Sequence, residues 1–290
     1  MGLLVGMGIH GNALAQRLKV DKSITSLITT EKNFEKEVFR LGQKAAYLSV
    51  LSDNSIVFRS EPQSGKKYYQ SNTKFQGLLN WDPVWVEVSK DGYFGYTTGP
   101  YRFLLNDSTL YGEYVSIWIR EPFQTKWKLF VDAGASHAKP LGPLPSLSYP
   151  TTVTQSYPSI YPGIIEQSKD ILLSTDVLFA SLMSTRTPVQ AYEEYLSPDS
   201  RMIEDGHLPI KGKDSIILNM NLHKGYLFFR PNASYVDYAN DMGFTYGAGE
   251  FVDANRKSKK DRKFSYLRIW RLGLDGLWRI SLELRTRKTS

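Results

Sequence analysis

The stretch LLNWDPVWVEVSKDGYFGYTTGPYRF, residues 78–103, decides the fold because its pattern returns later in the chain. The later stretch, residues 226–251, reads YLFFRPNASYVDYANDMGFTYGAGEF. Three anchors recur in order at a constant offset of 148: Gly95, Thr97 and Gly99 match Gly243, Thr245 and Gly247. Self-similarity at a fixed spacing is the signature of a repeated structural unit. The chain therefore uses one fold twice.

The segments that follow these stretches also repeat. Residues 111–134 read YGEYVSIWIREPFQTKWKLFVDAG, and residues 264–284 read FSYLRIWRLGLDGLWRISLEL. Two pairs match at an offset of 152, Tyr114 with Tyr266 and Trp118 with Trp270, and two at 151, Trp127 with Trp278 and Asp132 with Glu283. Small changes of offset between matched strands put the insertions in turns, as a duplication predicts.

Each copy begins with helical periodicity and continues with alternating strands. We expect helices over residues 23–41, 43–51, 164–183 and 188–196. Short strands at 56–58 and 202–203 precede longer ones near 81–89, 93–104, 112–121, 127–134, 229–238, 243–252, 264–272 and 278–285. This order predicts an α+β fold in two tandem copies, in each of which the N-terminal helices pack on one face of a strongly curved antiparallel sheet.

The same order sets the expected domains. Residues 23–137 form the first domain, 138–163 a linker and 164–288 the second domain. The linker carries six prolines and almost no charge, which is typical of a stiff, extended connector. A chain of 290 residues is long enough for two domains that each bury a core.

The composition excludes several kinds of chemistry. The chain has no cysteine, so a disulfide framework, a thiolate nucleophile and a cysteine-ligated metal are all absent. Its four histidines lack metal-ligand spacing, and we expect neither a metal nor a cofactor. Part of the net charge of +7 is concentrated in two basic runs, residues 256–263 and 285–288. We interpret them as a solvated hairpin tip and a frayed tail, and expect no nucleic-acid partner.

The amino terminus reads MGLLVGMGIHGNALAQ. Ala13-Leu14-Ala15 has the small-x-small pattern of a signal-peptidase site, so we interpret residues 1–16 as the remnant of a signal peptide. This predicts export to a periplasm or cell surface; otherwise the protein is cytoplasmic. No stretch reaches the length of a membrane span. The G-x-G-x-x-G pattern over residues 6–11 lacks a preceding strand, so we reject a dinucleotide loop.

Residues 81–101 follow W-x-P-x-x-x-E-V-S-x-x-G-x-x-G-Y-T-T-G-P-Y, and Tyr114-x-x-x-Trp118 comes after them. This pattern resembles the SnoaL-like branch of the nuclear transport factor two-like superfamily. The resemblance implies a cone of curved sheet closed by helices, often dimeric through the sheet face. A tandem chain would form that pair internally, as a pseudo-dimer, with a homodimer as the alternative.

Relatives in that superfamily include polyketide cyclases, ketosteroid isomerases and scytalone dehydratases, while others only bind. The resemblance therefore implies a protein that binds a small apolar or aromatic molecule in at least one cone. Of the two cones, the resemblance favours the first. Metal-free isomerase, cyclase or dehydratase activity is one hypothesis, and a non-catalytic binding or scaffold module is the alternative. The second copy has Tyr235 where the first has Glu87, so the polar positions have diverged.

Asp132 and Glu283 are acids at matched positions of the last strands, where a carboxylate could act as a general base. Strict alternation puts Trp127, Leu129 and Val131 on the opposite face from Asp132, which instead favours a position toward solvent or the sister domain. His137 follows the same strand and could exchange protons or simply be solvated. We take Asp132 and His137 as the candidate catalytic residues.

Aromatic residues are the candidate ligand-binding groups: Trp81, Tyr96, Trp118, Tyr246 and Trp270. Phenol and indole groups suit a planar apolar ligand, and Tyr96 could donate to a developing oxyanion. The alternative is that these side chains fill the core.

Overall fold

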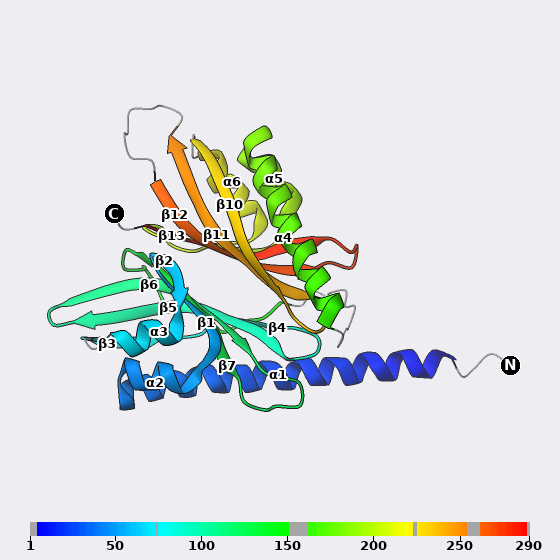
Figure 1. The fold of residues 1–290 in the computed structure, drawn as a ribbon, viewed down its shortest axis with the longest axis horizontal. Helices are drawn as coiled ribbons and strands as arrows, with labels where there is room; N and C mark the ends of the chain where they lie inside the picture. Colours follow the sequence, from blue (N-terminus) through cyan, green and yellow to red (C-terminus); the bar gives the residue numbers. More distant parts are fainter. Residues whose placement is uncertain (1–4, 73–74, 151–161, 223–224, 254–261, 289–290) are drawn as a thin grey trace.

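The computed structural model describes residues 5–72, 75–150, 162–222, 225–253 and 262–288. Part of the proline-rich linker, most of the basic run at 256–263 and the first four residues lie outside this range, so the interpretations placed on them stay predictions. Two sheets make up the fold (Figure 1), one of seven strands and one of six.

The described residues of the first half form three helices and seven strands: α1 (Val5–Leu41), α2 (Gln43–Val50), β1 (Leu51–Arg59), β2 (Glu61–Ser64), α3 (Gly65–Ser71), β3 (Leu78–Trp81), β4 (Trp85–Val88), β5 (Phe94–Leu105), β6 (Ser108–Ile119) and β7 (Lys128–His137). Its sheet has the order β2-β1-β7-β6-β5-β3, with β4 also paired to β5.

The second half of the chain repeats this order: α4 (Pro162–Thr185), α5 (Pro188–Tyr195), β8 (Leu196–Glu204), β9 (Ile210–Lys211), α6 (Lys213–Leu222), β10 (Gly225–Val236), β11 (Met242–Asp253), β12 (Arg262–Leu272) and β13 (Trp278–Arg287). Its sheet has the order β10-β11-β12-β13-β8-β9. The α+β class predicted from the sequence is confirmed.

Several details differ from the prediction. β1 and β8 are longer than the short strands expected, and they pair in parallel with β7 and β13, so the sheets are not purely antiparallel. α1 begins at Val5, so the G-x-G-x-x-G pattern lies within a helix and not in a phosphate-binding loop. The expected frayed tail is wrong, because β13 extends to Arg287 and buries Arg285.

The recurring glycines mark where a helix crosses its sheet. A Cβ added to Gly95 would lie 2.7 Å from Leu27 Cδ2 on α1, and one added to Gly243 would lie 2.7 Å from Leu172 Cδ2 on α4. The same Cβ atoms would also meet strand backbone, with Glu87 O at 2.8 Å from Gly95 and Tyr235 O at 2.4 Å from Gly243, so a side chain fits at neither position. Leu27 and Leu172 are separated by 145 residues, and the same offset relates the other helical positions compared below.

The core has three parts. One apolar cluster fills the space between α1, α2 and the first sheet, and another fills the space between α4, α5 and the second sheet. A third cluster contains residues of both halves, including Phe94, Val131, Phe244 and Leu282. The helices therefore lie on the outer faces and the two sheets pack against each other in the middle, as Figure 1 shows.

The contact between the sheets is polar at one end and aromatic at the other. Glu87 pairs with Arg271 of the second half at 2.7 Å, and Arg271 also reaches Asp199 at 2.5 Å. Elsewhere the ring centroids of Phe130 and Tyr235 are 4.9 Å apart.

Among the described helices, none is long and apolar enough to cross a membrane.

Candidate functional site

A cavity of about 330 Å³ that opens to solvent lies between the helices and the sheet of the first half. We call it the inner cavity. Its wall is largely aromatic, with a small polar group around one carboxylate. The lining residues that matter below are Phe34, Tyr47, Arg59, Trp81, Tyr114, Ser116 and Asp132.

A β-bulge turns Asp132 toward this cavity. Ile117 pairs with Val131 but Trp118 pairs with Leu129, so Phe130 is an extra residue in β7. Leu129 packs in the helix-facing cluster, whereas Val131 packs between the sheets. A bulge inverts the alternation of side chains beyond it. The predicted orientation of Asp132 toward solvent or the sister half is therefore wrong.

Asp132 is held by an arginine that the sequence did not indicate. Arg59, the last residue of β1, donates from Nη2 to Asp132 Oδ2 at 2.5 Å and to the Tyr69 hydroxyl at 2.8 Å. The Asp132 side chain is 10% exposed and that of Arg59 is 31% exposed. Burial opposes the charge on Arg59, but Asp132, Tyr69 and Tyr47 together outweigh burial and hold the pKa of the guanidinium above its usual value.

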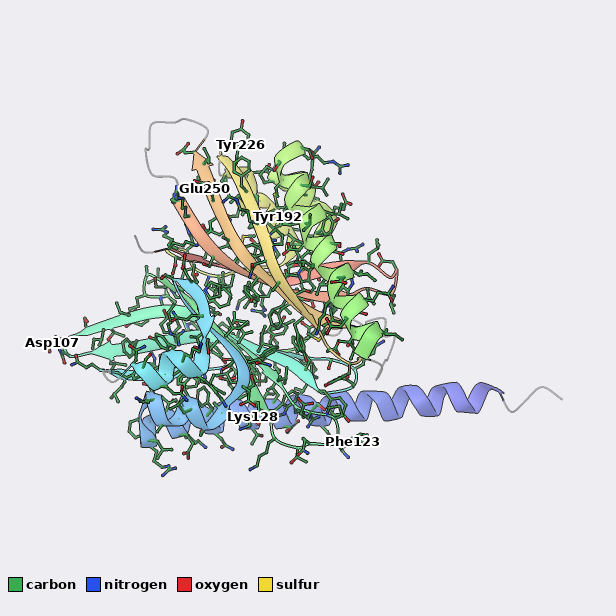
Figure 2. All side chains as sticks on the ribbon, viewed as in Figure 1. Asp107, Phe123, Lys128, Tyr192, Tyr226 and Glu250 are labelled. Atoms are coloured by element: carbon green, nitrogen blue, oxygen red, sulfur yellow. The ribbon has the colours of Figure 1, made fainter. Side chains whose placement is uncertain are left out.

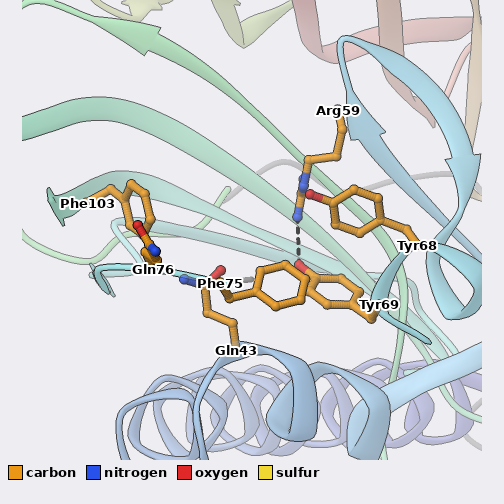
Figure 3. Close-up of a pocket in the computed structure, with 7 residues that line it drawn as sticks. All are labelled: Gln43, Arg59, Tyr68, Tyr69, Phe75, Gln76 and Phe103. Atoms are coloured by element: carbon orange, nitrogen blue, oxygen red, sulfur yellow. Dashed lines mark hydrogen bonds between the residues drawn. The ribbon is translucent and has the colours of Figure 1, made fainter. Parts of the chain in front are cut away.

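A second cavity of about 450 Å³ shares Gln43, Arg59 and Phe103 with the first. We call it the outer cavity. Figure 3 shows Arg59 and the aromatic rings of Tyr68, Tyr69 and Phe75 around it. Tyr69 and Phe75 are stacked with their centroids 5.2 Å apart. Arg59 therefore stands between an aromatic outer chamber and the inner chamber that holds Asp132.

In the second half the space that corresponds to the inner cavity is filled by a side chain, and a cavity of only about 50 Å³ remains beside Met220, Leu227 and Phe264. Arg268 projects from β12 into this space and is fully buried. Its guanidinium pairs with Glu283 at 2.6 Å and with Asp176, and Glu283 also accepts a hydrogen bond from Tyr192 at 2.6 Å. Figure 2 labels Tyr192 within the second half, close to α4. Burial alone would raise the pKa of Glu283, but Arg268 and Arg285 outweigh that effect and lower it.

Strand pairing shows which positions correspond. Ser116 pairs with Thr97 and Asp132 in the first half, and Arg268 pairs with Thr245 and Glu283 in the second. Ser116 therefore occupies the position of Arg268. The inner cavity exists where the first half has a serine and the second half has an arginine.

A buried acid also lies beside the inner cavity. Glu31 on α1 accepts hydrogen bonds at 2.6 Å from the Trp81 indole, the Thr97 hydroxyl and the Trp118 indole. Burial raises the pKa of Glu31 to about 7, although these three donors oppose the shift. Glu31 thus fixes the orientation of Trp81, which lines the cavity.

Of the predicted site residues, Asp132 and Trp81 line the inner cavity. His137 does not; its Nδ1 lies 2.7 Å from the carbonyl oxygen of Ala138. As the last residue of β7, His137 lies outside the set of residues that line the inner cavity.

Four predicted ligand-binding residues serve as core instead. Trp118 and Trp270 are fully buried, and the Trp270 indole donates to Thr245 at 2.8 Å. Tyr96 lies between the two sheets, where its hydroxyl donates to Glu87 at 2.9 Å. Tyr246 packs against the same inter-sheet cluster. The prediction that these side chains line a ligand pocket is wrong, because their faces of the strands meet packed side chains rather than a cavity.

The residues of the site that were not predicted from the sequence are Arg59, Ser116, Tyr47 and Glu31. One signal was available: at the offset of 152 that relates Tyr114 to Tyr266, Ser116 falls opposite Arg268. Where one copy of a strand has a serine and the other has an arginine at the same inward position, the two interiors differ by one large side chain.

No protein-family model matches this chain, and no curated protein matches it. Solved structures similar to it include a ketosteroid isomerase-like protein from Erwinia carotovora atroseptica, with 13% identity and a TM-score of 0.36 over 44% of this chain and 96% of that one. An NTF2-like protein from Cytophaga hutchinsonii has 21% identity and a TM-score of 0.34 over 41% and 96% of the two chains. An LEH-like epoxide hydrolase from M. tuberculosis has 12% identity and a TM-score of 0.32 over 41% and 79%.

The activity in each name is that of the similar protein.

Proposed function

We propose that the first half binds a small, mostly apolar or aromatic molecule in the inner and outer cavities, and that the second half binds none. The observation that carries this proposal is the inner cavity itself, which has the Asp132 and Arg59 pair on its wall. Ligand pockets are typically apolar clefts of roughly 300–1,000 Å³ with a few convergent polar groups. The two cavities together fit that description.

The test is a binding screen with small aromatic compounds, using ligand-observed NMR and calorimetry on the wild-type chain and on Ser116→Arg. This substitution puts into the first half the side chain that fills the second half. We expect compounds that bind the wild type to bind the variant at least about tenfold more weakly, a change of about 1.4 kcal/mol. Ser174→Arg is the matched control, because Ser174 is exposed on α4. Binding that survives Ser116→Arg would overturn the proposal.

A second candidate function is metal-free acid–base catalysis of the isomerase, cyclase or dehydratase kind. Asp132 favours it, because a carboxylate on the wall of an apolar cavity can accept a proton from a bound molecule. We expect Asp132→Asn to abolish turnover of any converted compound while neutral compounds still bind. Turnover that persists in Asp132→Asn would show that Asp132 is not the base, and a wild type that binds compounds but converts none would favour the non-catalytic binding or scaffold module.

Two further parts of the proposal concern the whole chain. We propose that the halves act as an intramolecular pseudo-dimer, since each sheet covers the face of the other. We also propose export, on the Ala13-Leu14-Ala15 pattern. Sequencing the amino terminus of the protein from its native source tests the second point, because cleavage at that pattern leaves Gln16 first.

A further inference from the structure

The second half contains, as part of its own chain, an occupant of the space that is hollow in the first half. The Arg268 guanidinium lies over three aromatic rings, 3.9 Å from the centroid of Phe229, 4.3 Å from Tyr266 and 4.4 Å from Phe179. A planar cation over the faces of several rings is a favourable cation–π arrangement. The second half thus shows what chemistry this interior accommodates.

The same aromatic cage surrounds the inner cavity. Phe34, Trp81 and Tyr114 correspond to Phe179, Phe229 and Tyr266 by their offsets and strand pairing. The ring contacts recur as well: Phe34 to Trp81 at 5.3 Å matches Phe179 to Phe229 at 6.0 Å, and Trp81 to Tyr114 at 6.2 Å matches Phe229 to Tyr266 at 5.1 Å. The cage is conserved between the halves while its occupant is not.

The acids of the cage recur too. Glu31 corresponds to Asp176 at the helical offset of 145, and Asp132 corresponds to Glu283. In the second half both acids pair with Arg268. In the first half the short, uncharged side chain of Ser116 stands where the second half has Arg268. The space that the Arg268 side chain fills in the second half is therefore part of the inner cavity in the first.

We infer that the inner cavity binds the planar cationic head of a small molecule, an amidinium or guanidinium group, in the position that Arg268 occupies in the second half. This inference rests on the proposed function and names the class of ligand. Asp132 would pair with the cation, and Phe34, Trp81 and Tyr114 would stack on it. The apolar remainder of the ligand would extend toward the outer cavity.

Arg59 does not exclude a second cation at Asp132. In the second half Glu283 already serves two guanidinium groups, with Arg268 Nε at 2.6 Å from Oε2 and Arg285 Nε at 3.4 Å from Oε1. Arg59 uses Oδ2 of Asp132. One buried carboxylate between two guanidinium groups is therefore an arrangement that this fold already contains.

The experiment compares three isosteric probes by calorimetry on the full chain: benzamidine, which is cationic, benzamide, which is neutral, and benzoate, which is anionic. We expect benzamidine to bind at least about tenfold more tightly than benzamide and benzoate to bind most weakly. Asp132→Asn should remove the preference for benzamidine, and Ser116→Arg should abolish its binding. The comparison on the wild type needs no variant, so it decides the question even if Asp132→Asn does not fold.

The failures are distinguishable. Benzamide binding as tightly as benzamidine would overturn the inference and leave the proposed function standing. Binding of benzamidine that persists in Ser116→Arg would put it outside the inner cavity and overturn the inference. If none of the three probes nor any aromatic compound of the screen binds, the proposed function fails together with the inference.

Discussion

The two halves share a frame and differ in what fills it. Both have an acid from the first helix, an acid from the last strand and a cage of three rings, yet one interior contains Arg268 and the other a cavity of about 330 Å³. An interior closed by a paired arginine contributes to stability, whereas an open one leaves its polar groups available to a ligand. The difference between the halves therefore lies in one inward position, where the first half has Ser116 and the second has Arg268.

Removing Arg268 gives the largest expected effect. Arg268→Ala leaves Asp176 and Glu283 as buried acids without their common partner, and breaking a buried ion pair from one side costs roughly 3–5 kcal/mol. We expect the free energy of unfolding to fall by about that amount, measured by urea denaturation. A loss below about 1 kcal/mol would show that the network contributes little and would weaken the contrast between the halves.

The same variant sharpens the comparison when a cation is added back. Arg268→Ala opens in the second half a space like the inner cavity, so methylguanidine should restore part of the lost stability. At a concentration about five times its dissociation constant, the expected gain is about 1 kcal/mol. Methylurea, which has a similar shape and no charge, is the control. Equal effects of the two compounds would contradict the role assigned to charge.

The acids of the first half predict a pH dependence of intermediate size. The folded protein holds the Glu31 proton more tightly than the unfolded chain, because burial raises the pKa of Glu31 from 4.5 to about 7. Stability is therefore greatest below pH 4.5 as far as this group is concerned, and it falls as the pH rises to about 7, where the contribution is lost. A shift of that size corresponds to a change on the order of 3 kcal/mol.

Glu31→Gln should flatten this part of the profile, measured as urea midpoints between about pH 5 and pH 8. Burial also raises the pKa of Glu113, at the contact between the halves, to about 7. Glu113→Gln is thus the matched variant, and each substitution should remove only its own part of the slope. A profile that Glu31→Gln leaves unchanged would contradict the titration of Glu31 in this range.

The sequence predicted the frame well because the frame depends on local and repeated features. Gly95 and Gly243 recur where a helix must cross a strand closely, and the strand patterns around them were readable from alternation. α3 was missed because its sequence, GKKYYQS, is short and lacks an apolar stripe. The signal for this helix in the sequence is its N-cap, Ser64, whose side chain accepts a hydrogen bond from the Lys67 amide.

The site was less predictable because it depends on a bulge and on long-range pairing. A phenylalanine at position 130 does not indicate a β-bulge, so the sequence does not show that Asp132 points toward the cavity. Arg59 and Asp132 are 73 residues apart and meet only because β1 pairs in parallel with β7. Alternation assumed without a bulge put every side chain beyond Phe130 on the wrong face. The contrast between Ser116 and Arg268 was the one clue in the sequence itself.

The smallest expected loss of stability is that of Arg59→Ala, which is to be compared with the loss in Arg268→Ala. Arg59→Ala removes an ion pair whose arginine is 31% exposed and whose acid lines a cavity, so water can solvate Asp132 afterwards. We expect a loss of about 1 kcal/mol or less in urea denaturation, against several for Arg268→Ala. The same variant should bind a cation more tightly, although it is less stable. Without Arg59 the Asp132 carboxylate no longer pairs with a guanidinium group of the protein, so benzamidine should bind a few-fold more tightly. A large loss of stability would mean that Arg59 is structural like Arg268, and the distinction between a packed interior and a binding interior would fail.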